Sequence, residues 1–404
     1  MTMKPFEKLV SRLEAGRIID ANVNQITRIE DVPLKEAAGR VLAADITAEF
    51  NVPPFRRASM DGYAVKAKDS MDASISKPKR LRLVGATHAG ESIDISVRDG
   101  ECIQIATGSP LPKGTDAVVM VEYTRLSGNT VEIMREASLG ENVADEGEDI
   151  KRGEIVVRAS EVLTPGRLGA AAALGLATLK VYAKPRVAIH STGNEIVPQG
   201  GTVKPGQIYD INSYTLTSIA QMSGCIPVWK GLVADNPREL QAAIKEAATC
   251  DIEVFSGGSS VGTRDLLAEV VEKLGVVHFH GLRVKPGKPT LFGSVKGKPI
   301  FGMPGNPSSC LSNAYVFLIP TLRKIARLPP IEMRKVKAKL SRAIVAGGER
   351  EVFYPVRLEK EKAVPLLMKG SNITSLAYAN GMIIIPVGTK RLEEGAEVEV
   401  LMLP

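Results

Sequence analysis

The stretch that most constrains the fold is a strand, a turn of small residues and a helix that follow each other without a gap. Residues 251–265 read DIEVFSGGSSVGTRD, and the short apolar run made by Ile252, Val254 and Phe255 is typical of a buried parallel strand. The Ser/Gly turn after it cannot continue a strand or a helix, and the next residues, LLAEVVEKL, have helical spacing. This order points backbone N–H groups and a helix N-terminus at one place, which suits an anion. Taken alone, the stretch fits an ordinary tight turn and a phosphate cradle about equally well.

Three residues of this stretch are candidates for a binding site. Gly257 and Gly258 would bring the backbone close to a ligand, and Asp265 adds a carboxylate beside the anion position. A divalent cation that bridges the anion and the carboxylate is the natural reason for such a neighbour. The spacing is neither a P-loop, because no Lys-Ser/Thr follows Gly262, nor a dinucleotide G-x-G-x-x-G motif.

From Pro185 onward, strand patterns alternate with helix patterns. RVAIHSTGNEI, IPVWKGLVADN and PIFGMPGN are interpreted as strands that run into turns. SYTLTSIAQMSG, RELQAAIKEAA and a last segment from Pro307 to about Ala326 are interpreted as helices. This alternation predicts a doubly wound, mostly parallel sheet, in an α/β domain that we assign to residues 181–328.

The rest of the chain predicts three further domains. Residues 46–145 carry short alternating runs broken by Gly and Pro, which indicate a β-rich domain. It is inserted into an elongated helical/β domain made of residues 1–45 and 146–180. Residues 329–404 contain five short strand-like runs and predict a small C-terminal β-barrel-like domain.

Three helices are expected in the elongated domain. The second runs over Pro33–Val41, and the third begins at Pro165 with Thr164 as its N-cap. The first helix has four apolar residues on one face: Phe6, Leu9, Val10 and Leu13.

Composition narrows the classes of partner. The formal charge of +7 is spread over mixed signs and aromatic residues make up only 4%, so no nucleic-acid partner is expected. The N-terminal residues carry charges throughout, and no apolar run reaches membrane-spanning length. Four widely spaced cysteines without a C-x-x-C pair favour reduced, buried thiols. We therefore expect a cytoplasmic chain with no membrane partner.

Polar residues follow four of the predicted strands. In open α/β sheets, ligands bind outside the carboxyl ends of the strands. Glu195, Asp235 and Asp265 each follow one strand, and the fourth runs into a helix whose N-terminus, near Ser309, is a further anion site. Four such ends predict a ligand site at this edge of the sheet. His190 ends one of these strands and is interpreted as a structural histidine.

Two lysines flank a stiff turn in the sequence LRVKPGKPTLFG. Lys285 and Lys288 stand on either side of Pro286 and Gly287. Alone, this pattern is typical of an exposed hairpin with two solvated lysines. Beside a Ser/Gly turn, the better interpretation is a paired clamp for an oxyanion or a phosphate. Glu195, Asp235 and Asp265 would then hold Mg²⁺ rather than repel the ligand.

Two loops of the inserted domain contain polar residues beside turns. PPFRRASMDGYAV carries Asp61, and GECIQIATGSPLPKGTDAVVMVE carries Thr107. By composition alone, both loops are structural turns.

Taken together, seven motifs resemble the molybdopterin molybdenumtransferases of molybdenum-cofactor biosynthesis, a family that includes the E domain of gephyrin. The resemblance covers essentially the whole chain and depends on these stretches in family order: PPFRRASMDGYAV, IATGSPLPKGTDAVVMVE, STGNEIV, YDINSYTL, FSGGSSVGTRD, VKPGKP and GMPGNPSSC. It implies an elongated homodimer with four domains per subunit, in which the α/β domain is molybdopterin-binding-like. It also implies an enzyme that binds adenylylated molybdopterin and molybdate. With Mg²⁺ or another divalent cation, such an enzyme releases AMP and leaves molybdenum on the pterin dithiolene. An upstream molybdopterin adenylyltransferase would supply its substrate.

The resemblance assigns roles to individual residues. Asp235 and Asp265 match positions linked to the metal and the adenylylated substrate, Glu195 matches the acidic residue of the T-G-x-E turn, and Ser260 matches a cradle serine near the phosphates. The molybdate pocket is matched by five residues: Lys285, Lys288, Ser309, Arg350 and Ser375. Asp61 and Thr107 match sensitive positions in the inserted domain, which in the family reaches over the partner subunit's site. The expected catalytic set is Asp61, Thr107, Glu195, Asp235, Asp265, Lys285 and Lys288. The expected substrate-binding set is Gly257, Gly258, Ser260, Ser309, Arg350 and Ser375.

Some alternatives stay open at this point. Arg56 and Arg57 stand where many members have an acidic residue or asparagine followed by a polar residue, so the charge around Asp61 is undetermined. A nucleotide-dependent phosphotransferase is one rival, against which the missing P-loop counts. A scaffold protein, as among the gephyrin relatives, is another. Tungstate could replace molybdate, because the two oxyanions have nearly the same size and charge.

Overall fold

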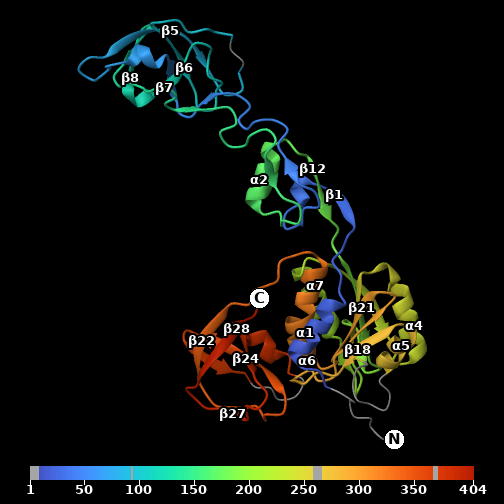
Figure 1. Cartoon of the computed structure of the whole chain (residues 1–404). Coiled ribbons are helices and arrows are strands. Elements are labelled where there is room, and N and C mark those ends of the chain that lie inside the picture. Colours follow the sequence, from blue (N-terminus) through green and yellow to red (C-terminus); the bar gives the residue numbers. More distant parts are fainter. Residues whose placement is uncertain (1–8, 92–93, 258–265, 367–371) are drawn as a thin grey trace. The chain divides into compact units, whose positions relative to one another are not determined.

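The computed structural model describes residues 9–91, 94–257, 266–366 and 372–404 (Figure 1). The chain divides into two compact units. Unit 1 holds the residues up to Glu30 together with Gly39–Val41 and Tyr182–Pro404, and unit 2 holds Asp31–Ala38 and Leu42–Val181. The division into four domains stays a prediction. None of the helices in the described ranges is both long and apolar enough to cross a membrane.

The centre of unit 1 is a six-stranded sheet with the strand order β16-β13-β17-β21-β20-β18. Its strands are β13 (Arg186–Thr192), β16 (Ile226–Val233), β17 (Ile252–Ser256), β18 (Val276–His280), β20 (Leu291–Val295) and β21 (Lys298–Met303). The first four strands in the spatial order are parallel, whereas β20 and β18 run antiparallel to their neighbours. The predicted doubly wound, mostly parallel sheet is therefore confirmed.

Helices cover both faces of this sheet (Figure 1). They are α1 (Arg12–Ala21), α3 (Asn212–Met222), α4 (Pro237–Glu246), α5 (Leu266–Leu274), α6 (Pro307–Asn313) and α7 (Ile319–Ile325). On β17, Val254 faces the core made with α1, α3, α6 and α7, while Phe255 faces the core made with α4 and α5. Every residue of β17 is buried, which explains why apolar residues occur on both faces of the strand. Each large apolar side chain buried in this way contributes about 1.5–3 kcal/mol of transfer free energy.

The long C-terminal helix of the α/β region contains a π turn. The expected helix from Pro307 to Ala326 is present as α6, a π-helical turn over Ala314–Leu318, and α7. Pro320 has no N–H and cannot make the usual i→i−4 hydrogen bond. The π turn lies directly before it and accommodates the interruption without ending the helix.

The C-terminal part of unit 1 is a closed barrel of five strands. The strands are β22 (Lys335–Leu340), β24 (Glu351–Glu359), β25 (Lys362–Pro365), β26 (Gly381–Ile385) and β28 (Glu397–Met402). The barrel closes because β24 pairs with both β25 and β26. A sixth, short strand, β19 (Val284–Lys285), joins β24 in parallel and links the barrel to the α/β region.

Unit 2 contains a β-rich part and a second part that packs around a helix. The β-rich part is a six-stranded sheet of order β7-β4-β6-β5-β9-β8. Its strands are β4 (Gly62–Val65), β5 (Lys79–Thr87), β6 (Glu101–Ile105), β7 (Ala117–Met120), β8 (Thr124–Ser127) and β9 (Thr130–Ile133). A second core surrounds helix α2 (Pro165–Ala173) and includes Leu42, Leu163 and Leu179.

The expected helices at the start of the chain need correction. Pro33–Val41 is not a helix, because β1 (Ile29–Pro33) leads only into a 3₁₀ turn at Leu34–Glu36. The first helix starts at Arg12 behind the N-cap Ser11, and it buries Ala15 and Ile19 rather than Leu13. Val10 instead bridges to Leu282, and Phe6 lies outside the described residues. In α2, by contrast, the Thr164 side chain caps the helix and Pro165 is its first residue, as predicted.

Candidate functional site

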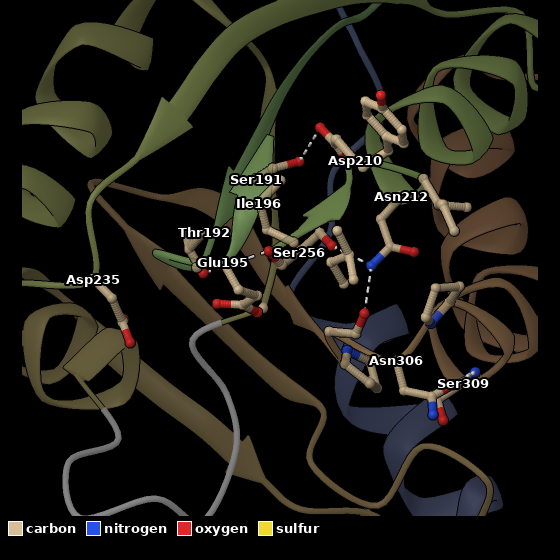
Figure 2. Close-up of a pocket in the computed structure, with 18 of the residues that line it drawn as sticks. Ser191, Thr192, Glu195, Ile196, Asp210, Asn212, Asp235, Ser256, Asn306 and Ser309 are labelled. Atoms are coloured by element: carbon tan, nitrogen blue, oxygen red, sulfur yellow. Dashed lines mark hydrogen bonds between the residues drawn. The ribbon is translucent and has the colours of Figure 1, made fainter. Parts of the chain in front are cut away.

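A pocket of about 500 Å³ opens at the carboxyl ends of β13, β16, β17 and β21 (Figure 2). The lining residues come from the ends of β13 and β17, from the segments after the four strands, from residues 208–212 at the start of α3, from the start of α6 and from Pro289. They are Ser191, Thr192, Gly193, Glu195, Ile196, Ile208, Tyr209, Asp210, Ile211, Asn212, Asp235, Ser256, Gly257, Pro289, Pro304, Gly305, Asn306, Pro307 and Ser309. The predicted concentration of polar groups at this edge of the sheet is confirmed, since all four strand ends contribute to one pocket.

Gly257 brings three strand ends close together. Its backbone has φ of +93°, and a Cβ atom at this position would lie 2.4 Å from the Thr192 carbonyl oxygen. The Gly257 N–H donates to the Met303 carbonyl oxygen at 3.0 Å. Only glycine fits this conformation and this approach, so the first glycine of the predicted turn is explained. The other predicted residues of the turn, Gly258, Ser260 and Asp265, lie outside the described residues.

Two predicted carboxylates line the same pocket. In Figure 2, Glu195 lies between Asp235 and Ser256. Both carboxylates belong to solvent-exposed residues, and their oxygens are ligands of the kind that Mg²⁺ prefers. Within the described ranges, no three His, Cys, Asp or Glu side chains converge as metal ligands. Of the predicted metal pair, Asp235 is therefore placed at the pocket, and Asp265 is not described.

A buried polar network forms one wall of the pocket, and the sequence analysis gave it no role. Ser191 Oγ donates to Asp210 Oδ2 at 2.8 Å, and the Ser213 N–H donates to Asp210 Oδ1 at 3.1 Å. Asn212 Nδ2 donates to Ser256 Oγ at 2.6 Å and to the Gly305 carbonyl oxygen at 2.8 Å (Figure 2). The network ties the start of α3 to the ends of β13, β17 and β21. The local signal in the sequence is Asp210, which stands just before the helical pattern and accepts from the Ser213 N–H in the manner of a helix cap.

Asn306 caps α6 at the pocket wall. Its Oδ1 accepts hydrogen bonds from the Ser308 N–H at 3.1 Å, the Ser309 N–H at 3.3 Å and Ser308 Oγ at 2.9 Å. A neutral side chain therefore already accepts from the N–H groups of this first turn, and the anion site expected at this helix N-terminus stays a prediction. Ser309 itself is 7% exposed and lines the pocket as predicted.

The other four residues predicted for the molybdate pocket are not among the lining residues of this pocket. Lys285 and Lys288 are not among its lining residues, although Pro289 is. The pairing of β19 with β24 sets Lys285 opposite Val352, two residues after Arg350. Helix α8 (Thr374–Tyr378), which carries Ser375, contacts both α6 and β24. The structure thus brings together the elements that carry all five residues.

In unit 2, Asp61 and Thr107 meet although they are far apart in the sequence. Asp61 Oδ1 accepts hydrogen bonds from the Thr107 N–H at 2.7 Å and from Thr107 Oγ1 at 2.9 Å. Both bonds lower the pKa of the exposed Asp61 carboxyl, and the bond from the Thr107 backbone N–H has the larger effect. Arg56 Nε donates to Asp145 at 2.9 Å, so an acidic neighbour balances its charge.

His190 does not line the pocket, and its side chain lies on the face of the sheet that α4 and α5 cover. It stacks on Phe255 with ring centroids 4.3 Å apart, in the core under α4 and α5. Its Nε2 lies 3.9 Å from Oε2 of the buried Glu253. Burial lowers the pKa of His190 to about 4 and raises that of Glu253 to about 8, so both groups are neutral near pH 7. This placement agrees with a structural role for His190.

Comparisons with known proteins agree along the chain. Residues 10–175 match the model of the MoeA N-terminal region (domain I and II), residues 188–324 that of a probable molybdopterin binding domain, and residues 337–403 that of the MoeA C-terminal region (domain IV). The molybdopterin molybdenumtransferase of Nostoc sp. is 32% identical over 100% of this chain and 96% of its own length. The molybdopterin molybdenumtransferase of Haemophilus influenzae is 36% identical over 89% of this chain and 90% of its own. A crystal structure of a molybdopterin biosynthesis MoeA protein from Pyrococcus horikoshii superimposes with a TM-score of 0.84 at 40% identity, covering 98% of this chain and 99% of that one.

Proposed function

Because this chain belongs to the molybdopterin molybdenumtransferases, which insert molybdenum in molybdenum-cofactor biosynthesis, we propose that its substrates are adenylylated molybdopterin and molybdate. In the proposed reaction, molybdenum is transferred to the pterin dithiolene and AMP is released. The observation that carries the proposal is the single pocket at four strand ends, which is lined by Gly257, Glu195, Asp235 and Ser309. A pocket of about 500 Å³ is within the usual size range for small-molecule sites.

The physical task in this reaction is to bring two anions together. Molybdate and a pyrophosphate-linked pterin repel each other, and the site must offset that repulsion. We assign this role to Lys285 and Lys288, whose turn lies beside the pocket residue Pro289. The side chains of Ser309, Arg350 and Ser375 would complete the oxyanion contacts from the neighbouring elements. Donors fixed before the ligand arrives stabilise developing charge more effectively than mobile ones.

A divalent cation fits the donors of the pocket. Glu195 and Asp235 offer exposed carboxylate oxygens there, and we propose that Asp235 and Asp265 hold Mg²⁺. When bound, Mg²⁺ would polarise the phosphoanhydride of the adenylylated substrate. The buried hydrogen bonds of Asp210 and Asn212 keep the pocket wall in place while the substrate binds.

Two further proposals concern the setting of the reaction. We propose that the chain acts as a homodimer in which Asp61 and Thr107 of one subunit complete the site of the other. The hydrogen-bonded, exposed Asp61 carboxylate is compatible with such a contact. We also propose a cytoplasmic location, where four buried free thiols stay reduced, and an upstream molybdopterin adenylyltransferase as the source of the substrate.

The decisive experiment measures AMP release from adenylylated molybdopterin in the presence of Mg²⁺, with and without molybdate. Release that depends on molybdate is the expected result, and tungstate in a parallel series gives the oxyanion preference. ATP turnover without any pterin would instead indicate a phosphotransferase. Pterin binding without release under either oxyanion would overturn the proposed reaction and point to a scaffold or binding protein.

A further inference from the structure

A buried asparagine of α6 holds the turn that carries Lys285 and Lys288 through hydrogen bonds. Asn313, the last residue of α6, is 0% exposed. Its Nδ2 donates to the Gly287 carbonyl oxygen at 2.9 Å and to Thr290 Oγ1 at 2.7 Å. Thr290 is also 0% exposed, and its Oγ1 donates to the Gly287 carbonyl oxygen at 2.9 Å. Three hydrogen bonds therefore close a ring between α6 and the lysine turn.

The packing at Gly287 makes this anchor specific. Gly287 has φ of +94°, and a Cβ atom there would lie 2.3 Å from Asn313 Nδ2 and 2.6 Å from Oδ1. The asparagine amide thus lies directly against the Gly287 Cα, in the space that any other residue would fill. The Leu282 N–H also donates to the Lys288 carbonyl oxygen at 2.8 Å, which closes the turn from its other side.

Asn313 shares a helix face with a residue of the pocket. Ser309 lies four positions earlier in α6, so the two side chains project from the same side of the helix, one turn apart. Ser309 lines the pocket while Asn313 holds the turn between the two lysines. One helix therefore fixes the spacing between the serine and the lysine pair.

We propose that Asn313 is a positioning residue for oxyanion recognition, which sets the Lys285–Lys288 turn at a fixed distance from Ser309. This inference rests on the proposed function, because it assumes that the lysine pair binds molybdate. Asn313 does not touch the oxyanion. Its amide supplies the donors that the Gly287 carbonyl and the Thr290 hydroxyl need in a place that water does not reach.

The first test removes hydrogen-bonding groups from Asn313 and Thr290 while keeping the shape of each side chain. Asn313→Asp removes both N–H donors, and Thr290→Val removes the hydroxyl while keeping the side-chain volume. We expect each full-length variant to bind molybdate at least about tenfold more weakly by titration calorimetry, and the KM for molybdate to rise while kcat changes less. Asn22→Asp is the matched control, since it removes an amide donor from the C-terminal end of α1 and should leave the molybdate Kd unchanged.

A double-mutant cycle separates positioning from general damage to the fold. Gly287→Ala forces a methyl group onto the Asn313 amide, so it should weaken molybdate binding by itself. In the Gly287→Ala/Asn313→Ala variant the clashing amide is gone, and we expect a loss smaller than the product of the two single losses. Effects that multiply independently would show that the contact does not set the turn.

The lysine variant distinguishes a failure of the positioning role from a failure of the proposed oxyanion site. If Lys285→Ala weakens molybdate binding but folded Asn313→Asp and Thr290→Val keep the wild-type Kd, the positioning role is wrong and the proposed function stands. If the wild-type chain binds no molybdate, or if Lys285→Ala binds it as well as the wild type, the oxyanion site itself is wrong and the inference falls with it.

Discussion

At the residue scale, the buried pair of His190 and Glu253 links the sheet to pH. Each residue is at most 3% exposed, and His190 Nδ1, His190 Nε2 and Glu253 Oε2 have no hydrogen-bond partner among the described residues. Lys298 and Lys230 favour the charged carboxylate of Glu253, but burial outweighs them and raises its pKa to about 8. The neutral forms of both groups are therefore the stable ones inside the protein.

This pair predicts a particular dependence of stability on pH. The folded state holds the Glu253 proton up to about pH 8, whereas the unfolded state releases it near 4.5, so its contribution to stability is lost as the pH rises over that interval. His190 acts in the opposite sense, since its contribution is lost as the pH falls from about 6.5 to about 4. The two slopes cancel between about pH 4.5 and 6.5, so the Glu253 effect stands alone above pH 6.5, with a slope of at most about 1.4 kcal/mol per pH unit.

Denaturant unfolding between pH 6.5 and 8 checks this expectation. Glu253→Gln cannot ionise and should flatten the decline, whereas Glu272→Gln, an exposed substitution on α5, should leave it as in the wild type. Equal slopes for the wild type and Glu253→Gln would show that Glu253 does not titrate in this range.

A second residue-scale prediction concerns the metal. Asp265→Ala should lower molybdate-dependent AMP release by at least about 100-fold while leaving the thermal unfolding midpoint close to the wild-type value, because it removes a proposed Mg²⁺ ligand. Asp94→Ala, at a carboxylate that is 95% exposed in unit 2, is the matched control and should keep full activity. Wild-type activity in Asp265→Ala would remove this residue from the metal site.

At the scale of elements, the start of α6 combines stability with the position of Ser309. Asn306→Ala leaves the N–H groups of Ser308 and Ser309 without their side-chain acceptor, and we expect a loss of about 1 kcal/mol in unfolding free energy. Because Ser309 lies in that first turn, the KM for molybdate should rise as well. Thr164→Ala removes the cap of α2 and should cost a similar free energy with no change in KM. A stability loss without a KM change in Asn306→Ala would separate the cap from the site.

The helices and strands also differ in how well the sequence predicted them. Strong periodicity and local caps sufficed for the α/β alternation, for α2 behind Thr164 and for the barrel strands, because these depend on neighbours in the chain. The segment Pro33–Val41 has helical spacing but forms a strand end and a 3₁₀ turn, since packing of Leu34 and Ala37 on the α2 core overrides weak propensity.

The residues of the site were predictable only where they directly follow a strand in the sequence. Glu195, Asp235 and Gly257 follow strands directly, and the rule for parallel sheets places them together. Apart from the local bond between Asp210 and Ser213, the partners of the Asp210, Asn212 and Asn313 side chains lie 19 to 93 residues away, and no local pattern specifies such distant pairs. The meeting of Asp61 with Thr107 is of the same kind, because 46 residues separate them.

At the scale of the whole molecule, a site shared between subunits can be tested by mixing two inactive variants. Asp61 belongs to unit 2 and Lys285 to unit 1. If the two residues complete one site from different subunits, Asp61→Ala and Lys285→Ala chains, each inactive alone, should recover about a quarter of wild-type activity after equal mixing, since half of the dimers are mixed and each has one intact site. AMP release after confirmed subunit exchange measures this recovery. No recovery would show that Asp61 and Lys285 do not complete one site from different subunits.

The π turn in the helix after Pro307 has a consequence for how the gene can change. A π turn holds one residue more than the α-helical turn it replaces, so it behaves as a one-residue insertion that the fold has absorbed. Deleting one codon between positions 314 and 318 would remove that extra residue and force the π turn into an α-helical turn. Ser309 and Asn313 would keep their direction relative to α7, but the ring of Pro320 would lie against the carbonyl group four residues before it, with no wider turn to relieve the clash. Loss of one residue should therefore be tolerated in the surface loops of this protein and selected against in this single turn.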